Sequence, residues 1–453
     1  MIKAFEWVKR ILLYVLALCM LLQIGMGLYW VICNFLSVPR IKETTEYLKA
    51  AQGLLLDEYM GILYPLFLRC VLAIEKVMGL PFWIPVYLIQ LLFASVVLWL
   101  FLKELTRDGK KRLFVLLYLM TIPMLLQYHM MVLPNSFLFS ISILLVLSGI
   151  KLWKKKVVKE KDVFALCGLW IVAALLHPDY LLIYGAWLIL YFVFFIIKRY
   201  MNKNIKYKLT LKIILVFFTS LIFIMLTNGL TQTPGSYGKM QRTMESMLFE
   251  RLVGQNFAST YSFWSLEVQD VVSLEDAVQI AKRSDNLRYE AGPVLEAALG
   301  KEKANKEYLQ MADQCFKVRT KETMYRIRDD FTDYLFSPFS LLSRGGNGHI
   351  SSAGYNYALF REHCPRLSKW YFWGSLGAMI FGCILSILIV LEKLFKREKP
   401  KFFGWLLLYM LLEASWVTIS SSNPINYGNV LFIIFIWYLI GIYYYITMNK
   451  NIS

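Results

Sequence analysis

The sequence predicts an all-α polytopic membrane protein with about ten transmembrane helices, outer interfacial helices and a mostly helical extracytoplasmic loop domain. Of its 453 residues, 58% are hydrophobic and 18% are charged, and the mean hydropathy is +0.51. A soluble chain carries roughly a quarter charged residues, so this composition argues against a soluble fold. The charged residues also fall in short blocks between apolar runs of membrane-spanning length.

Each span needs about 20 predominantly apolar residues, within a range of roughly 17–25. We expect spans at 11–35, 82–102, 113–129, 134–150, 163–177, 180–197, 211–229, 370–391, 402–421 and 429–447. The run at 163–197 is divided at His177-Pro178-Asp179 because proline disfavours the helical conformation of the residue before it. A single pass there would also place one of its two flanking basic clusters on the outer side.

The formal net charge of +18 does not indicate nucleic-acid binding, because the basic residues are dispersed between apolar runs. They cluster at 103–112, 151–161, 198–212 and 393–401. Since cytoplasmic loops carry such an excess of Lys and Arg, we expect these clusters and both termini in the cytoplasm. The first apolar run is too long for the core of a cleavable signal peptide, so we expect a signal anchor. Because no other targeting feature is present, we expect the membrane to be a bacterial plasma membrane.

Two longer outer segments divide the chain into three predicted parts. An N-terminal transmembrane module at 1–229 contains the first outer loop at 36–81. An extracytoplasmic domain follows at 230–368, and a C-terminal transmembrane module occupies 369–453.

The first outer loop contains two amphipathic stretches, near 43–56 and 60–78. The second stretch carries Arg69, Glu75 and Lys76, and charged side chains are costly inside lipid. We therefore expect this stretch to lie at the membrane interface rather than to cross the bilayer.

The extracytoplasmic domain is expected to be mostly helical, because apolar residues recur at helical spacing over 272–299. Another helical stretch is predicted at 302–334, and the glycine-rich segment 343–348 after it is expected to be a mobile loop. Cys315 and Cys364 are candidates for a disulfide in this domain. The sequence leaves open whether they are close enough to pair.

Ionisable residues beside the membrane are candidate functional residues, because charged groups are costly near lipid and are kept mainly where they have a role. The first outer loop begins with KETTEY at 42–47, and Tyr64-Pro65 follows it. His177-Pro178-Asp179 marks the outer end of a predicted span. This pattern resembles the GT-C membrane glycosyltransferases. The nearest likeness is to the aminoarabinose-transferase and protein O-mannosyltransferase (family 39) type, in which Asp-Glu-x-x-Tyr opens the first outer loop.

The resemblance covers helix order over most of the chain, but specific residues only over about 40–70. It implies an inverting enzyme that moves a sugar from a polyprenyl-phosphate donor to an extracytoplasmic glycan, lipid or protein acceptor. In such an enzyme a carboxylate deprotonates or orients the acceptor hydroxyl. A cation, either a divalent metal ion or Lys or Arg, stabilises the departing phosphate. Glu43 takes the place of this carboxylate, which is usually Asp in the family, so the chain departs by one methylene group.

The resemblance also implies roles for neighbouring residues. The candidates that line the site are Glu46, Tyr47, Asp57, Tyr64, His177 and Asp179, and those that bind the donor phosphate are Lys42 and Arg69. Structural alternatives stay open for the ionisable candidates: solvated surface charges, partners of lipid headgroups, and residues that end or cap a helix. Glu413 lies within a predicted span, where we expect it to face the bundle and to hydrogen-bond with Ser or Asn.

Two other functions stay open. One is a transporter or flippase for a lipid-linked or anionic substrate. Transporters tend to carry inverted repeats and helices broken near the bilayer midplane. The sequence displays neither, although Pro123 lies within a predicted span. The other is an inactive GT-C relative, which the departure at Glu43 keeps open.

Overall fold

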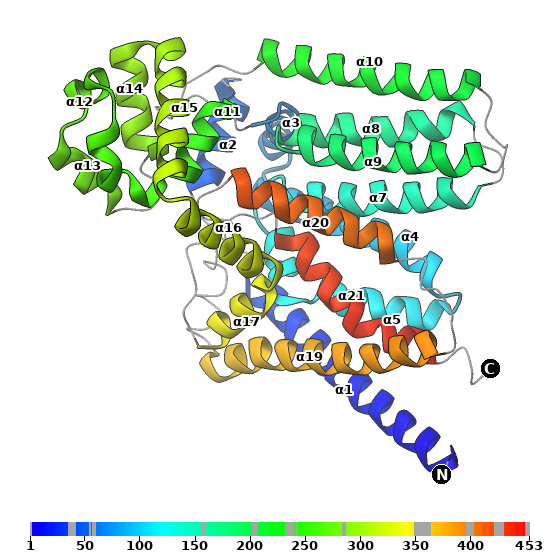
Figure 1. Cartoon of the computed structure of the whole chain (residues 1–453). Coiled ribbons are helices and arrows are strands. Elements are labelled where there is room, and N and C mark those ends of the chain that lie inside the picture. Colours follow the sequence, from blue (N-terminus) through cyan, green and yellow to red (C-terminus); the bar gives the residue numbers. More distant parts are fainter. Residues whose placement is uncertain are drawn as a thin grey trace.

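The computed structural model describes residues 2–34, 42–53, 56, 60–155, 159–201, 207–231, 240, 243–282, 287–347, 364–395, 403–420 and 430–448. Within these residues the secondary-structure elements are all helices. Figure 1 shows a bundle of long helices lying side by side and a group of shorter helices beside one end of it. We call that end of the bundle the domain end and the opposite end the basic end.

The helices of the bundle cover the predicted apolar runs, with one run, 113–129, divided between two short helices. The bundle helices are α1 (Ile2–Asn34), α4 (Trp83–Leu105), α5 (Gly109–Met120), α6 (Pro123–His129), α7 (Asn135–Lys154), α8 (Glu160–Leu176), α9 (Tyr180–Met201), α10 (Tyr207–Thr231), α19 (Pro365–Phe395), α20 (Phe403–Ser420) and α21 (Val430–Met448).

Five described helices, α1, α4, α7, α9 and α10, are long and apolar enough to cross a membrane. The bent pair of α5 and α6 makes a sixth span when it is counted as one. The prediction of an all-α membrane protein is therefore confirmed, whereas ten spans stay a prediction.

Ion pairs join the helix ends at the basic end. Glu104 at the end of α4 lies 3.6 Å from both Lys151 and Lys154 at the end of α7. Lys212 near the start of α10 pairs with Glu160 at the start of α8. Three of the predicted basic clusters thus gather at one end of the bundle, while most of 393–401 lies outside the described residues. The membrane face to which this end belongs stays a prediction.

The expected hinge between the fifth and sixth apolar runs is confirmed. α8 ends at Leu176, and His177 is extended, with φ −155° and ψ 123°. A turn closes from the Tyr180 N–H to the His177 carbonyl (3.1 Å), and α9 begins at Tyr180. Pro178 accounts for the extended residue before it.

The prediction that Pro123 lies within one continuous helix over 113–129 is wrong. α5 ends at Met120, α6 begins at Pro123, and their axes differ by 78°. Ile122 between them is extended, with φ −63° and ψ 128°. Pro123 has no N–H to donate to a preceding helix, and its ring disfavours the helical conformation of Ile122. The helix therefore ends before Pro123.

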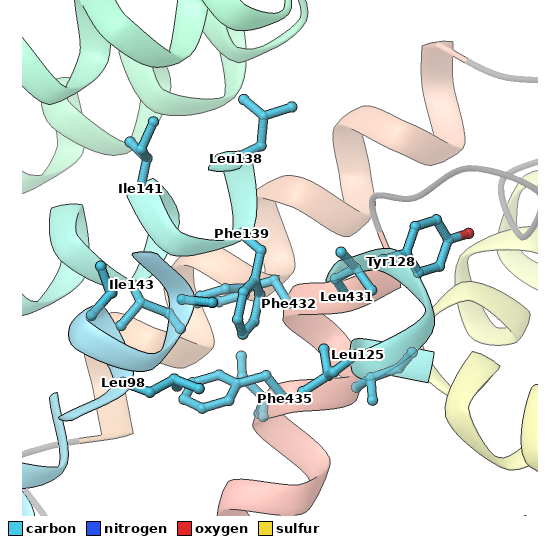
Figure 2. Close-up of a cluster of buried hydrophobic side chains, with 14 of the residues drawn as sticks. Leu98, Leu125, Tyr128, Leu138, Phe139, Ile141, Ile143, Leu431, Phe432 and Phe435 are labelled. Atoms are coloured by element: carbon cyan, nitrogen blue, oxygen red, sulfur yellow. The ribbon is translucent and has the colours of Figure 1, made fainter. Parts of the chain in front are cut away.

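The core of the bundle lies where α4, α6, α7 and α21 meet (Figure 2). Phe435 of α21 contacts Phe139 of α7 and Phe101 of α4, with ring centroids 5.6 and 5.5 Å apart. Leu125 of α6 is buried in the same cluster. The break before α6 therefore leaves this short helix packed inside the bundle.

The shorter helices beside the domain end follow from residue 244 onward. They are α11 (Met244–Leu248), η1 (Phe249–Val253), η2 (Gly254–Asn256), η3 (Ala258–Phe263), α12 (Leu266–Val271), α13 (Leu274–Ala281), η4 (Leu287–Ala291), α14 (Gly292–Leu299), α15 (Lys301–Val318), α16 (Thr320–Leu335) and α17 (Ser337–Asn347).

The first of these helices, from α11 to α15, share a hydrophobic core that is separate from the bundle core. Phe249 stacks on Tyr308 with ring centroids 4.6 Å apart, and Phe257 lies against Trp264 at 4.3 Å. A mostly helical domain at this position is what the sequence predicts. Its apolar residues pack against one another, so the domain has a core of its own.

The prediction of one helical stretch over 302–334 is wrong in one respect, because the stretch forms two helices. α15 ends at Val318 and α16 begins at Thr320, with Arg319 at φ −126° and ψ 36° between them. α16 leaves the separate core and reaches the bundle, where Tyr334 is buried. The Trp437 indole N–H of α21 donates to the Leu335 carbonyl at 2.9 Å.

The prediction of a mobile loop at 343–348 is also wrong for the described residues 343–347, which continue α17. Leu342 is buried in the bundle core, and Phe339 contacts Trp437 with ring centroids 4.9 Å apart. This packing outweighs the low helix propensity of Gly345 and Gly346.

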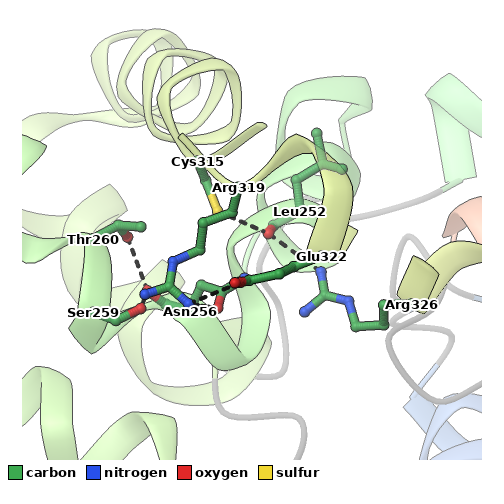
Figure 3. A network of polar contacts seen from close by, with 8 residues as sticks. All are labelled: Leu252, Asn256, Ser259, Thr260, Cys315, Arg319, Glu322 and Arg326. Carbon is green, nitrogen blue, oxygen red and sulfur yellow. Dashed lines mark hydrogen bonds and ion pairs between the residues drawn. The ribbon is translucent and has the colours of Figure 1, made fainter. Parts of the chain in front are cut away.

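The candidate disulfide between Cys315 and Cys364 is not formed, because Cys315 lies in the separate core and Cys364 packs against the bundle core. Cys315 is buried in the separate core and donates to the Leu252 carbonyl at 3.2 Å (Figure 3). Arg326 donates to the same carbonyl at 3.3 Å. Burial raises the pKa of the Cys315 thiol. Cys364 instead lies 3.3 Å from the Tyr29 hydroxyl of α1.

The α19–α21 pair provides a stability test. A Cβ at Gly382 would lie 2.4 Å from the Gly441 carbonyl oxygen, whereas a Cβ at Gly377 on the same helix meets nothing within 4 Å. We expect Gly382→Ala to lower the free energy of unfolding by about 1–3 kcal/mol, because the two backbones must separate. Thermal unfolding in detergent micelles, followed by circular dichroism, measures the effect. Equal transitions for Gly382→Ala and the control Gly377→Ala would contradict this account.

Candidate functional site

The predicted site segments meet at the domain end of the bundle. The first outer loop forms α2 (Lys42–Gly53) and α3 (Leu63–Met78), in agreement with the two predicted amphipathic stretches. Gly61, just before α3, lies against the last residues of α8: a Cβ there would be 2.1 Å from the Leu175 carbonyl oxygen. The start of α3 is therefore held beside the turn that begins at His177.

Tyr47 and Tyr64 form the centre of the contact between α2 and α3. Both are buried, and their rings meet edge to face with centroids 5.2 Å apart. The Gln90 amide of α4 donates to the Tyr64 hydroxyl at 3.1 Å and to the Leu133 carbonyl at 2.9 Å. The Thr44 hydroxyl donates to the Val132 carbonyl at 3.5 Å. These bonds join α2, α3 and α4 to the turn before α7.

Burial, followed by the proximity of Tyr47, raises the pKa of Tyr64 well above its usual value. Tyr64 is therefore a neutral phenol that accepts a hydrogen bond from Gln90. It acts here as a packing and positioning group, and a buried neutral phenol at this place does not supply a negative charge.

The other predicted residues of the first outer loop differ in their surroundings. Glu46 is half-buried on α2, and Arg69 is on the exposed side of α3. The side chains of Lys42 and Glu43 fall outside the described part of the chain, although both residues belong to the first turn of α2. Asp57 lies entirely outside the described residues.

His177 and Asp179 face each other across the turn between α8 and α9. The His177 Nδ1 lies 3.7 Å from an Asp179 carboxylate oxygen, and both side chains are partly exposed. The His177 ring also meets Tyr180 edge to face, with centroids 6.1 Å apart. This pair can hold a proton or orient a polar ligand at the surface of the domain end.

Below this turn lies a set of hydroxyl groups that the sequence analysis missed. The Ser142 hydroxyl of α7 donates to the Leu138 carbonyl at 2.9 Å and contacts the Tyr184 hydroxyl of α9. It also lies 2.9 Å from the Tyr409 hydroxyl of α20. Tyr180 meets Tyr184 edge to face at 5.0 Å, so tyrosines continue from the His177 turn to Ser142.

Glu413 of α20 lies beside these tyrosines. Its side chain is buried, and one of its carboxylate oxygens has no hydrogen-bond partner among the described residues. The expected bond from the other oxygen to Ser or Asn stays a prediction. The tyrosines that interact electrostatically with this carboxylate are Tyr180, Tyr184, Tyr334 and Tyr409.

We call Glu413 and these tyrosines the Glu413 cluster. It joins α9 and α20 of the bundle to α16, which supplies Tyr334. Burial and then the proximity of Glu413 raise the pKa of Tyr334 well above its usual value. The only signal in the sequence was an acidic residue inside an apolar run, because the tyrosines come from distant segments.

The described residues contain no group of three or more His, Cys, Asp or Glu side chains arranged to hold a metal ion. Several candidate ligands, among them Asp57, His349 and His363, fall outside those residues. A divalent metal ion at the departing phosphate therefore stays a prediction.

Comparisons of the chain with protein-family models, curated proteins and solved structures give no match. The functional argument consequently depends on the residues and their geometry.

The contact at Gly61 can be tested directly. We expect Gly61→Ala to push the first outer loop away from α8, because its Cβ would lie 2.1 Å from the Leu175 carbonyl oxygen. The cost should be about 1–3 kcal/mol, with faster amide exchange over α2 and the start of α3. Hydrogen–deuterium exchange with mass spectrometry measures this. Gly53→Ala is the control, because a Cβ there meets nothing within 4 Å. Unchanged exchange in Gly61→Ala would argue against the contact.

The hydroxyl set around Ser142 provides another test. Ser142→Ala leaves the buried hydroxyls of Tyr184 and Tyr409 without this partner, so we expect a loss of about 1–3 kcal/mol in stability. The control is Ser415→Ala, which removes a similar bond, to the Leu411 carbonyl (2.7 Å), at an exposed position. It should change stability by less than about 0.5 kcal/mol. Similar unfolding temperatures for the two variants would contradict the proposed bonds.

Proposed function

We propose that the chain is a GT-C-type membrane glycosyltransferase, which moves a sugar from a polyprenyl-phosphate donor to an acceptor outside the cytoplasm. The observation that supports this function best is the contact of Gly61 with the end of α8. Because of it, the segments that carry the resemblance, at 42–47, 64–65 and 177–179, are neighbours at one end of the bundle. A transferase for a lipid-linked donor needs its site at such a membrane surface.

In the proposed reaction, the acceptor hydroxyl attacks the anomeric carbon of the donor sugar. The new bond joins the acceptor oxygen to that carbon, the bond between the carbon and the phosphate oxygen breaks, and the configuration inverts. Glu43 accepts the proton of the hydroxyl as a general base. The positive charges of Lys42 and Arg69, or a divalent metal ion, stabilise the phosphate that leaves.

Two features of this end of the bundle support the proposal. Thr44 and Tyr47, which follow Glu43 in the sequence, are buried and fix the first turns of α2 against the bundle, which is how a rigid element holds a catalytic group in place. His177 and Asp179 are partly exposed beside α3, where an acceptor can approach them. The separate core from α11 to α15 gives the same end a domain for acceptor selection.

A transporter or flippase for a lipid-linked or anionic substrate is the second candidate. Two observations favour it: the helix break at Pro123 and the carboxylate of Glu413 buried in α20. Discontinuous helices and ionisable groups inside the membrane are typical of transporters. An inactive relative of the transferases is the third candidate, because Glu43 stands where the family usually has Asp.

Lipid-linked sugar in membranes of cells that lack this protein tests the proposal. We expect a polyprenyl-phosphate sugar to accumulate in these cells and to clear when the wild-type chain is restored. It should persist with well-expressed Glu43→Gln, because loss of the general base slows transfer by at least about 100-fold. The control Glu302→Gln, in the first turn of α15, should clear the sugar as wild type does. Mass spectrometry of lipid extracts measures all four strains.

Two outcomes would contradict the proposal in different ways. If Glu43→Gln clears the lipid-linked sugar like wild type, Glu43 is not the catalytic carboxylate. If no such lipid accumulates without the protein, the transferase itself is wrong, and transport of a lipid-linked or anionic substrate becomes the leading candidate.

A further inference from the structure

α1 and α19 pack against each other with their chains running in opposite directions (Figure 1). Met26 of α1 lies 3.7 Å from the position that a Cβ would take at Gly374 of α19. From this contact, α1 continues to its last turn at Cys33, while α19 runs back to its start after Cys364. The two cysteines therefore lie at the same end of the helix pair, which is the domain end.

One hydroxyl group, that of Tyr29, links Cys364 to the end of α1. The Tyr29 hydroxyl lies 3.3 Å from the Cys364 sulfur. Cys33 lies one helical turn after Tyr29, on the same face of α1. Cys364 therefore lies against the face of α1 that carries Tyr29 and Cys33.

Other pairings are less suited to a disulfide. Cys33 is exposed at the last turn of α1 and Cys364 is partly exposed just before α19, and both are free thiols in this structure. Cys167, Cys315 and Cys383 are buried. Cys315 in particular lies in the separate core of α11 to α15, away from Cys364 at the start of α19.

We propose that Cys33 and Cys364 form a disulfide that ties the end of α1 to the start of α19. This inference depends on the orientation proposed above, in which the domain end is outside the cytoplasm, where disulfides persist. The disulfide does not depend on the transfer reaction. Either proposal, the disulfide or the transferase, can therefore be wrong while the other is right.

The bond forms by thiol–disulfide exchange with an oxidised protein dithiol of the extracytoplasmic space. One thiolate of the pair attacks the disulfide of that oxidant and forms a mixed disulfide. The second thiolate then attacks the sulfur of its partner and releases the oxidant as a dithiol. The two cysteines lose two protons and two electrons, and the oxidant takes up both electrons.

The test uses the full chain in membranes. Free thiols are blocked with N-ethylmaleimide under denaturing conditions, disulfides are then reduced, and the thiols released are labelled with polyethylene glycol maleimide. We expect wild type to gain two labels on a gel, and Cys33→Ser and Cys364→Ser to gain none. The control Cys70→Ser, which removes an exposed thiol of α3, should still gain two.

Two results would overturn the proposal. If wild type gains no label, both thiols are reduced in the cell. If Cys33→Ser still gains label, Cys364 or another cysteine has a different partner. Mass spectrometry of unreduced wild-type peptides checks the pair without any variant, because only the proposed bond joins the peptide of Cys33 to that of Cys364.

Discussion

The close backbone contact between Gly61 and the end of α8 determines how the domain end is arranged. Lipid supplies little hydrophobic drive between helices, so packing in a membrane depends on small residues and hydrogen bonds. At Gly61 the absence of a side chain lets the start of α3 rest on the Leu175 carbonyl. Tyr64 then reaches Tyr47 on one side and Gln90 on the other. Together with the hydrogen bonds of Thr44 and Gln90, this contact fixes the first outer loop relative to His177.

Polar groups inside the bundle also hold its helices together below the domain end. Ser142 joins hydroxyls from α7, α9 and α20, and a buried hydroxyl is stable only when it has such partners. Glu413 lies beside the same tyrosines and interacts with Tyr334 of α16. The helix that leaves the separate core thus contributes directly to the polar interior of the bundle. The domain end and the bundle interior are parts of one packed unit.

Local chemistry explains which features the sequence could predict. Pro178 divides two apolar runs at a polar turn, so both hydropathy and charge indicate the hinge there. Pro123 acts on Ile122 in the same way, but no charged residue marks the break, and the apolar run continues through it. Gly345 and Gly346 indicate a loop, yet Leu342 and Phe339 hold α17 on the bundle. The Glu413 cluster could not be predicted, because its tyrosines are distant in sequence and meet only through helix packing.

The two leading functions make different demands on these contacts. A transferase needs its groups fixed at one membrane surface, whereas a transporter must open its site to each side in turn. Gly61 on α8 and the hydroxyls around Ser142 connect the first outer loop, α7, α9 and α20 by backbone contact and hydrogen bonds. A rocking motion between these helices would have to break buried bonds without water to replace them, which is costly in a membrane. The broken pair α5 and α6 packs against α4 and α21, and α6 also packs on α7 of this set. These connected helices therefore favour a transferase that acts at one membrane surface, and the helix break at Pro123 is compatible with that function.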